Sequence, residues 1–352
     1  MQWFVYIVYI HPNFHKMSIK QVQHLKKSIC KVLGSHRAFN YKEPYIREEA
    51  EQSGGTAFFV DPKEFGKNFK SSVNKRYLLT NFHVVSTLES NCCTLHYPEH
   101  GMAYITAKVE FVIPKLDVAI LSIDITSEQP MWVGNLSDYL DGVPNLKLSE
   151  SIVKGNSQKV LAIGFPNLSK DYQICHGIIS GRGLGMIQLN ISLNGGNSGG
   201  PLLFNGYVIG ICTASISESE ALGLAVPMTQ ILHFFQKWSK FDSTILDIPC
   251  WGVITMATSG DYLEFNDIDK IKGVLVNKVF PDTGMSKFKE RDILMSIESN
   301  GISYDIDMYG LISVDWTDKK IPIHNDEFIL SLNPNDIKIA YYNNRLKEVK
   351  TR

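Results

Sequence analysis

Short apolar runs separated by turn residues occupy the chain from about Ser53 to Pro227. The runs are rich in Val, Ile, Leu and Phe, and Gly, Asn, Pro and Ser stand between them. Many short strands with few helical periods are typical of β-sandwiches and β-barrels. We therefore expect an all-β core here, with strands that include Gly55–Val60, Arg76–Thr80, Val118–Ile123, Val160–Gly164 and Tyr207–Ile211.

The length of the chain favours two domains, because 352 residues exceed what one hydrophobic core usually organises. A helical pattern over Thr229–Trp238 is followed by a polar connector that ends in Pro249. Strand-like runs and turns then resume. We predict a first domain over residues 1–238, a linker over 239–249 and a second domain over 250–352.

The N-terminal region predicts a strand and a helix. Residues 1–10 are apolar and rich in β-branched and aromatic side chains, as in a buried strand. This run is too short to span a bilayer and lacks the features of a signal peptide, so we expect an intracellular protein of unassigned compartment. An amphipathic helix is predicted over residues 18–34, where Ser18 and Gln21 resemble a capping box and Gly34 suits the helix end.

Composition and charge exclude several classes of protein. Hydrophobic residues make up 44% and charged residues 20% of the chain, and the net charge is -1. This balance is ordinary for a folded protein and supplies no overall field for nucleic acid or a membrane surface, so we expect neither partner. The six cysteines show no regular spacing and no zinc pattern, which predicts reduced structural thiols and no metal or other cofactor.

One serine, Ser198, stands among four glycines in the segment Asn194–Pro201. Ordering so many glycines is costly, so the segment needs a reason. A nucleophile supplies one, because it must project from a tight turn whose backbone N–H groups converge on the carbonyl oxygen under attack. An ordinary glycine-rich hairpin loop is the alternative.

A serine nucleophile needs a general base, and His83 follows a predicted strand that could hold an imidazole rigidly. A lone histidine beside apolar residues is usually structural until a partner is found. Asp117 opens the buried-looking strand Leu116–Leu121 and is a candidate for that partner, because an unpaired buried charge is costly. The order His83, Asp117, Ser198 predicts a catalytic triad.

These segments resemble the HtrA/Deg family of trypsin-fold serine proteases. The likeness extends to the second domain, which is similar to the PDZ domain that follows the protease in that family. It implies a trypsin-like double β-barrel followed by a PDZ-like domain. The segments that carry it are Ser53–Val60, Leu79–Val85, Asp117–Leu121, Asn194–Pro201, Leu222–Pro227, Gly273–Pro281 and Glu290–Ile297.

The resemblance implies a role for each matching residue. Ser198 is the nucleophile, His83 the general base and then acid, and Asp117 its orienting partner. The oxyanion hole consists of the backbone N–H groups of Gly196 and Ser198. Asn197 stands where zymogen-activated relatives have an aspartate, so activation by proteolysis is not expected.

The resemblance also implies binding sites. The S1 pocket is predicted at Ser192, Thr213, Ala214 and Leu224. Ser192 is not a carboxylate, so small aliphatic substrate side chains are expected, with Phe or Tyr as the alternative. In the PDZ-like domain, the candidates for binding a peptide terminus are Trp251, Gly252 and Val253. The alternative there is a groove filled by the chain itself.

We therefore expect a serine endopeptidase for unfolded or damaged proteins, with a PDZ-like domain that binds peptide termini. A homo-oligomer, a trimer or a multiple of it, is expected from the family's habit of assembling through N-terminal aromatic residues. The corresponding residues are Trp3, Phe4, Tyr6 and Phe14. Two alternatives remain open, a non-catalytic peptide-binding scaffold or chaperone and an esterase for small acyl substrates.

Overall fold

The structure is a computed structural model of the chain. It describes residues 25–352 except 37–40, 44, 46–50, 89, 102, 130–133, 152–156, 184, 214–221, 269 and 318. The predicted N-terminal strand and Ala214 of the predicted S1 pocket lie outside the described residues. So do the aromatic residues to which we ascribed oligomerisation.

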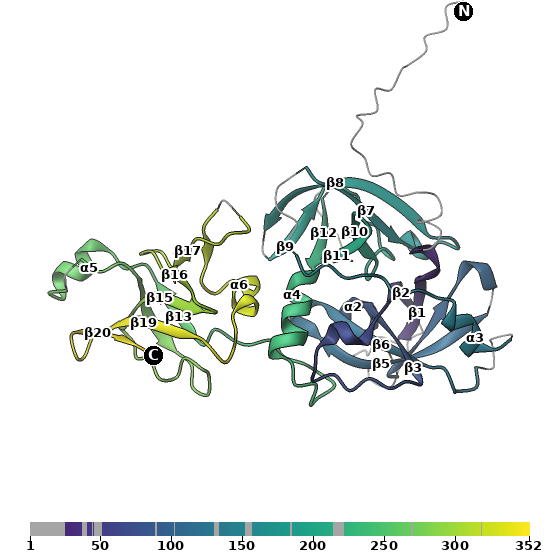
Figure 1. The fold of residues 1–352 in the computed structure, drawn as a ribbon, viewed down its shortest axis with the longest axis horizontal. Coiled ribbons are helices and arrows are strands. Elements are labelled where there is room, and N and C mark those ends of the chain that lie inside the picture. The colour runs from purple at the N-terminus through teal and green to yellow at the C-terminus, as the bar shows by residue number, and fades with distance from the viewer. Residues whose placement is uncertain are drawn as a thin grey trace, which may run out of the picture.

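Two closed six-stranded barrels form the first part of the molecule (Figure 1). The first, in the order β1-β2-β3-β6-β5-β4, contains β1 (Ile29–His36), β2 (Glu51–Val60), β3 (Lys75–Thr80), β4 (Cys92–His96), β5 (Tyr104–Ile113) and β6 (Val118–Asp124). The second, in the order β10-β11-β12-β9-β8-β7, contains β7 (Lys159–Gly164), β8 (Gln173–Gly183), β9 (Met186–Leu189), β10 (Pro201–Phe204), β11 (Tyr207–Thr213) and β12 (Gly223–Pro227). The predicted double β-barrel is confirmed.

A shared apolar core holds the two barrels together. Phe58 of β2 is fully buried, and it belongs to the same cluster as Ile163 of β7 and Leu203 of β10. Each such side chain stabilises the fold by about 1.5–3 kcal/mol relative to an exposed one. The packed barrels therefore fix the positions of the loops that leave their strands.

Strand β1 occupies residues for which the sequence pattern predicts a helix. Residues 25–27 are helical, but Ile29–His36 pairs with β2 along its length and with β4 at 31–33. Gly34 does not end a helix; a Cβ there would lie 2.0 Å from Leu88 Cδ2, so glycine permits close packing within the barrel. The helix prediction is wrong for this part because closing the barrel satisfies the backbone of β1 on both sides.

Short helices connect the strands. One of them, α2 (Phe82–Val85), carries His83. Another, α4 (Met228–His233), continues into the π-helix η5 (Phe234–Trp238) at the end of the second barrel. The others are α3 (Leu136–Asp141), η1 (Pro62–Phe65), η2 (Pro98–His100), η3 (Pro114–Leu116) and η4 (Pro166–Leu168).

The connector after η5 is attached to the first barrel. Val112 of β5 donates its N–H to Thr244 O at 2.8 Å, and Leu246 donates to Val112 O at 2.8 Å. Leu246 and Ile248 are buried in the core shared by the barrels. The domain limits given above stay predictions, but part of the predicted linker packs as a component of the barrel.

The C-terminal part is built around a six-stranded sheet with the order β13-β14-β15-β19-β20 and β16 paired to β15. A short two-stranded sheet, β17 and β18, is separate from it. The apolar core of this C-terminal part includes Phe328, Leu294 and Ile297. This arrangement is compatible with the predicted PDZ-like domain. Its elements are β13 (Val253–Met256), α5 (Gly260–Phe265), β14 (Val274–Val279), β15 (Ile293–Ser299), β16 (Ile302–Asp305), β17 (Leu311–Ile312), β18 (Ile321–Pro322), α6 (Asp326–Ser331), β19 (Lys338–Asn343) and β20 (Glu348–Thr351).

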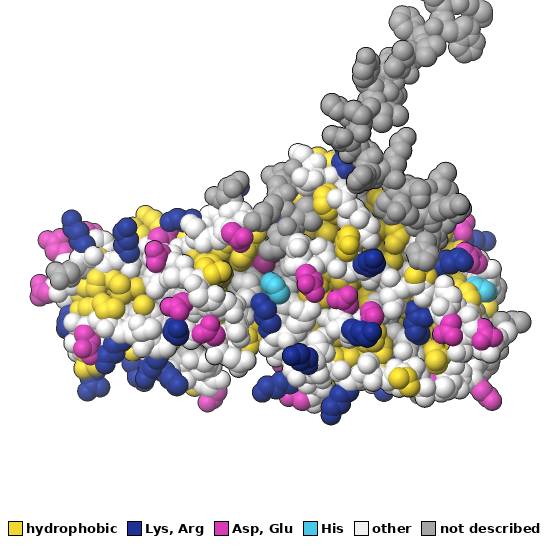
Figure 2. All heavy atoms as spheres, viewed as in Figure 1, with side chains coloured by type: hydrophobic (Ala, Val, Ile, Leu, Met, Phe, Trp, Pro, Cys, Tyr) yellow, Lys and Arg dark blue, Asp and Glu magenta, His cyan; other side chains and the backbone are white. Residues whose placement is uncertain are grey.

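The C-terminal sheet stands beside the barrels, and α6 faces α4 across the junction (Figure 1). Acidic and basic side chains are interspersed over the face of the molecule in Figure 2. This distribution agrees with the net charge near zero.

Candidate active site

Ser198 lies in the turn between β9 and β10, where two glycines have backbone angles that other residues rarely adopt. Gly196 has φ +94° and Gly199 has φ +86°. A Cβ at Gly196 would lie 2.2 Å from Phe165 O, and one at Gly199 would lie 2.1 Å from Thr56 O. Glycine is therefore required on both sides of Ser198, which places this residue on a tight, closely packed turn.

Thr56 of β2 anchors this turn to the first barrel. Its hydroxyl donates to Gly196 O at 2.7 Å and accepts from Phe165 N at 3.2 Å. Its backbone N–H donates to Ser198 O at 2.8 Å. Thr56 lies within a segment that carries the family resemblance, but no pattern in the sequence predicts a role for it.

The backbone N–H groups of the turn fall into two groups. Those of Asn197, Gly199 and Gly200 donate to backbone carbonyls at 3.1, 2.9 and 3.0 Å. Those of Gly196 and Ser198 donate to no acceptor among the described residues. Two free N–H groups at these positions are what an oxyanion hole needs.

His83 lies on α2 and is held by Asp117. The Nδ1 atom of the ring lies 2.8 Å from Asp117 Oδ2 and 3.0 Å from Oδ1, and the His83 backbone N–H donates to Oδ1 at 2.9 Å. A carboxylate can only accept, so Nδ1 carries the proton and Nε2 remains an acceptor when the ring is neutral. The His83 side chain is 43% exposed, which leaves it accessible to a substrate.

Two further side chains hold Asp117. Thr213 of β11 donates its hydroxyl to Asp117 Oδ2 at 2.9 Å, and the Asn81 side-chain amide donates to Asp117 O at 2.8 Å. Asp117 itself has the left-handed φ of +55° at the end of η3. The sequence predicts neither contact, because no spacing along the chain indicates that β11 and the start of α2 lie beside this turn.

The turn that carries Ser198 and the segment that carries His83 both pack against β2. A Cβ at Gly55 would lie 2.6 Å from Val84 and 2.7 Å from Ser198 O, so both segments contact the strand at this glycine. Among the described residues, no hydrogen bond joins Ser198 to the His83 ring. Such bonds are often long in proteases without substrate.

Comparisons with known proteins agree with this arrangement. The model of the trypsin-like peptidase domain matches residues 55–211, a range that includes His83, Asp117 and Ser198. The chain is 25% identical to "Putative protease Do-like 3, mitochondrial" of Arabidopsis thaliana over 82% of its length and 49% of the relative's. It is 26% identical to "Probable periplasmic serine endoprotease DegP-like" of Marinomonas sp. (strain MWYL1), over 75% of this chain and 56% of that protein.

The chain contains a trypsin-like peptidase domain and is similar to serine proteases of the HtrA/Deg family. It spans about half the length of these curated relatives. Among solved structures, the fold is similar to that of "HtrA-type protease AlgW with decapeptide", with a TM-score of 0.59, 20% identity and coverage of 94% of this chain and 95% of that one.

The residues predicted to line the S1 pocket lie at the end of the second barrel. Ser192 is exposed, and Thr213 and Leu224 are paired on the neighbouring strands β11 and β12. The hydroxyl of Thr213 is engaged with Asp117 rather than free to face a substrate. The composition of the pocket stays a prediction.

The predicted peptide-binding residues of the C-terminal domain lie at the start of β13, an edge strand of the sheet. Gly252 has φ +81° and accepts a hydrogen bond from Phe280 N at 2.9 Å, and Val253 is paired with Val279. The indole N–H of Trp251 is buried and has no partner among the described residues. An edge strand next to such a turn fits a peptide added as a further strand, which stays a prediction.

The described part of the chain offers few other groups that could carry chemistry. It contains no group of three or more His, Cys, Asp or Glu side chains arranged to hold a metal ion. None of its helices is both long and apolar enough to cross a bilayer. Burial raises the pKa of the Cys93 and Cys212 thiols to about 12, so these two residues are unreactive at neutral pH.

Proposed function

We propose that this protein is a serine endopeptidase in which Ser198 is the nucleophile, His83 the general base and Asp117 the residue that orients His83. The observation that carries the proposal is that the Asp117 carboxylate holds both the ring and the backbone of His83. The ring Nδ1 lies 2.8 Å from Oδ2, and the backbone N–H donates to Oδ1 at 2.9 Å. The similarity to HtrA/Deg serine proteases supports the same activity. The free N–H groups of Gly196 and Ser198 supply an oxyanion hole.

The proposed reaction has two halves. His83 Nε2 takes the hydroxyl proton of Ser198 as Oγ attacks the carbonyl carbon of a peptide bond, and the oxyanion accepts hydrogen bonds from Gly196 and Ser198 N–H. His83 then gives its proton to the departing amine, which leaves an acyl-enzyme. Water, activated by His83, releases the acid product and restores the serine. Asp117 stabilises the imidazolium that forms in each half.

The finer parts of the proposal concern substrates and assembly. Unfolded or damaged polypeptides are the proposed substrates, with small aliphatic side chains before the cleaved bond. The C-terminal domain, over residues 250–352, would bind peptide termini along the edge of β13 beside Trp251, Gly252 and Val253. A homo-oligomer and an intracellular location are proposed from the sequence; the named relatives are described as mitochondrial and periplasmic.

Degradation of an unfolded model protein by the purified chain tests this proposal. We expect wild type to cleave and Ser198→Ala to be inactive, with a loss on the order of 10⁶-fold because the nucleophile is removed. Ser127→Ala, which changes an exposed serine of the first barrel, is the matched control and should cleave like wild type. Cleavage sites mapped by mass spectrometry report the preferred side chain.

Equal cleavage by wild type and Ser198→Ala would reject Ser198 as the nucleophile. Cleavage by neither, with folding intact, would favour a non-catalytic peptide-binding scaffold. Hydrolysis of small esters without cleavage of the unfolded protein would favour an esterase.

A further inference from the structure

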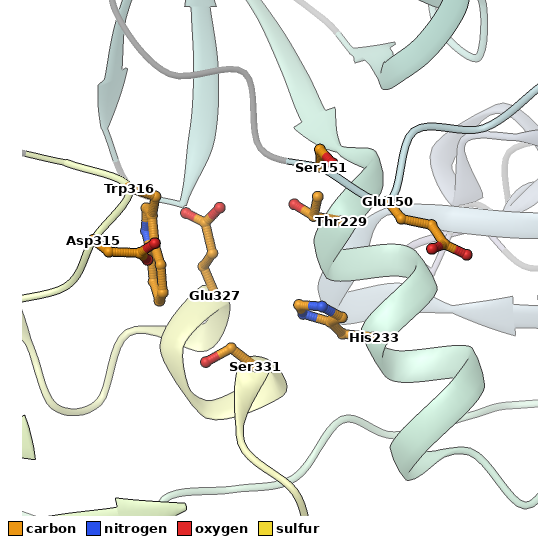
Figure 3. Close-up of a pocket in the computed structure, with 8 residues that line it drawn as sticks. All are labelled: Glu150, Ser151, Thr229, His233, Asp315, Trp316, Glu327 and Ser331. Carbon is orange, nitrogen blue, oxygen red and sulfur yellow. The ribbon is translucent and has the colours of Figure 1, made fainter. Parts of the chain in front are cut away.

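A cavity of about 310 Å³ lies at the junction of the barrels and the C-terminal domain (Figure 3). One wall comes from α4, and the opposite wall comes from α6 and the segment before β18. It is separate from Ser198, His83 and Asp117. The lining residues are Glu150, Ser151, Thr229, His233, Asp315, Trp316, Glu327 and Ser331.

Contacts between α6 and the barrels fix the spacing of the two walls. Arg182 Nη1 lies 2.8 Å from Glu327 Oε1, and Trp238 Nε1 donates to Leu330 O at 3.1 Å. Lys237 Nζ donates to the carbonyl of Ser331 at 2.8 Å. Leu330 is fully buried in the core shared by the barrels. These contacts hold the two walls of the cavity at a fixed distance from each other.

The charged side chains that line the cavity are acidic. Glu150, Asp315 and Glu327 are carboxylates, and none of the described lining residues is Lys or Arg. Burial, together with nearby Lys237, lowers the pKa of His233 to about 4, so this imidazole is uncharged at neutral pH. Arg182 and Lys237 lie beside the cavity and offset two of these three negative charges, so a net negative charge remains, which favours a positively charged ligand.

A buried hydroxyl without a partner also points to a ligand. Thr229 is 4% exposed, and its Oγ1 makes no hydrogen bond with any described residue. In Figure 3 it extends from α4 into the space toward Glu327 and Trp316. Buried polar groups normally have partners, so an unpartnered hydroxyl in a polar cavity requires an explanation.

We infer that this cavity binds an alkyl primary ammonium group, which donates hydrogen bonds to Thr229 Oγ1 and the carboxylate of Glu327 and lies against the indole of Trp316. Arg182 occupies only Oε1 of Glu327, so the second oxygen can accept. An ammonium has three N–H donors and interacts with an aromatic face. A bare metal ion fits less well, because the carboxylates do not form a metal-binding group.

Calorimetric titration of the full chain with butylammonium chloride at constant ionic strength tests this inference. Butylammonium should bind and 1-butanol, its neutral counterpart, should not. Tetramethylammonium has the charge but no N–H donor, so it should bind more weakly. Equal binding of butylammonium and 1-butanol, or no binding of butylammonium, would overturn the inference.

The decisive variant is Thr229→Val, which removes the hydroxyl and keeps the shape. Its affinity for butylammonium should fall at least about tenfold, the effect of losing a hydrogen bond to a charged group, while its melting temperature without ligand should not fall. Thr258→Val is the matched control, because Thr258 also buries an unpartnered hydroxyl but does not line the cavity. Unchanged affinity in Thr229→Val would contradict the inference. Glu327→Gln should also weaken binding and provides a second test.

Two sources carry this chemistry, a lysine side chain of a peptide and a free diamine. Titrations with Nα-acetyl-lysine amide and with putrescine distinguish the two sources, because the compound with the lower dissociation constant indicates the source. Hydrogen exchange then locates the site: a ligand in the cavity should slow exchange in both α4 and α6. Slowing confined to another part of the chain would place the ligand elsewhere and overturn the assignment.

Discussion

Two carboxylates at junctions of the molecule differ in how fully they are bonded. Asp117 lies where the two barrels meet and accepts hydrogen bonds from the His83 backbone, the His83 ring and Thr213. Glu327 lies where the C-terminal domain meets the barrels, and Arg182 is its one hydrogen-bond donor among the described residues. Burial raises the pKa of Glu327 despite this arginine.

The difference indicates two uses of a carboxylate at a junction. A carboxylate whose two oxygens are both hydrogen-bonded holds its neighbours in one arrangement, as a residue that orients a catalytic base must. A carboxylate with spare accepting capacity in a polar cavity can take a further donor. This difference is consistent with the roles proposed above, positioning for Asp117 and ligand binding for Glu327.

Asp117→Asn should have the largest effect on activity. The amide can donate to Nδ1 of His83 and stabilise the wrong tautomer, so kcat should fall about 10⁴-fold with little change in stability. Initial rates on a peptide substrate and thermal unfolding measure the two effects. A fall in kcat of less than tenfold would mean that Asp117 does not orient a base.

Arg182→Met should destabilise the junction, because it leaves Glu327 buried without its cation. We expect the free energy of unfolding at neutral pH to fall by about 3 kcal/mol. The double variant Arg182→Met with Glu327→Leu should recover most of this loss, since no uncompensated charge remains. Urea unfolding measures both, and a double variant as unstable as the single one would contradict the explanation.

Thr213→Val removes one donor from Asp117 and should lower kcat roughly ten- to hundredfold, with KM nearly unchanged. Thr213→Ser keeps the hydroxyl and should restore most of the rate. A change confined to KM would instead support the earlier prediction that Thr213 lines the S1 pocket.

The smallest effect concerns His233 at the wall of the cavity. Its pKa is lowered from 6.5 to about 4 in the folded state, so the unfolded chain binds a proton more readily between these values. Stability should therefore fall as the pH drops from 6.5 toward 4, by about 1–2 kcal/mol for a partly exposed ring. His233→Gln should lack this contribution when the two unfolding curves are compared across that range. Parallel pH profiles would show that His233 does not titrate in this way.

Patterns along the chain failed where pairing between distant segments decided the structure. The period of apolar residues over 18–34 predicts a helix, but 29–34 lies in β1, because β2 and β4 offer its backbone partners on both sides. The polar composition of residues 239–249 predicts a linker, but the backbone N–H of Leu246 donates to Val112 O and the Leu246 side chain is buried. Local preference is weak compared with such long-range contacts.

The sequence by itself predicted an all-β core and the candidate residues His83, Asp117 and Ser198, and its resemblance to the HtrA/Deg family implied the double barrel. It could do so because short strands and a serine among glycines leave recognisable local patterns. Only the tertiary structure decided that Thr213 bonds Asp117, that Thr56 anchors the turn of Ser198 and that Thr229 and Glu327 face one cavity. These contacts join residues on separate strands and helices, and the spacing of residues along a chain does not encode such distances.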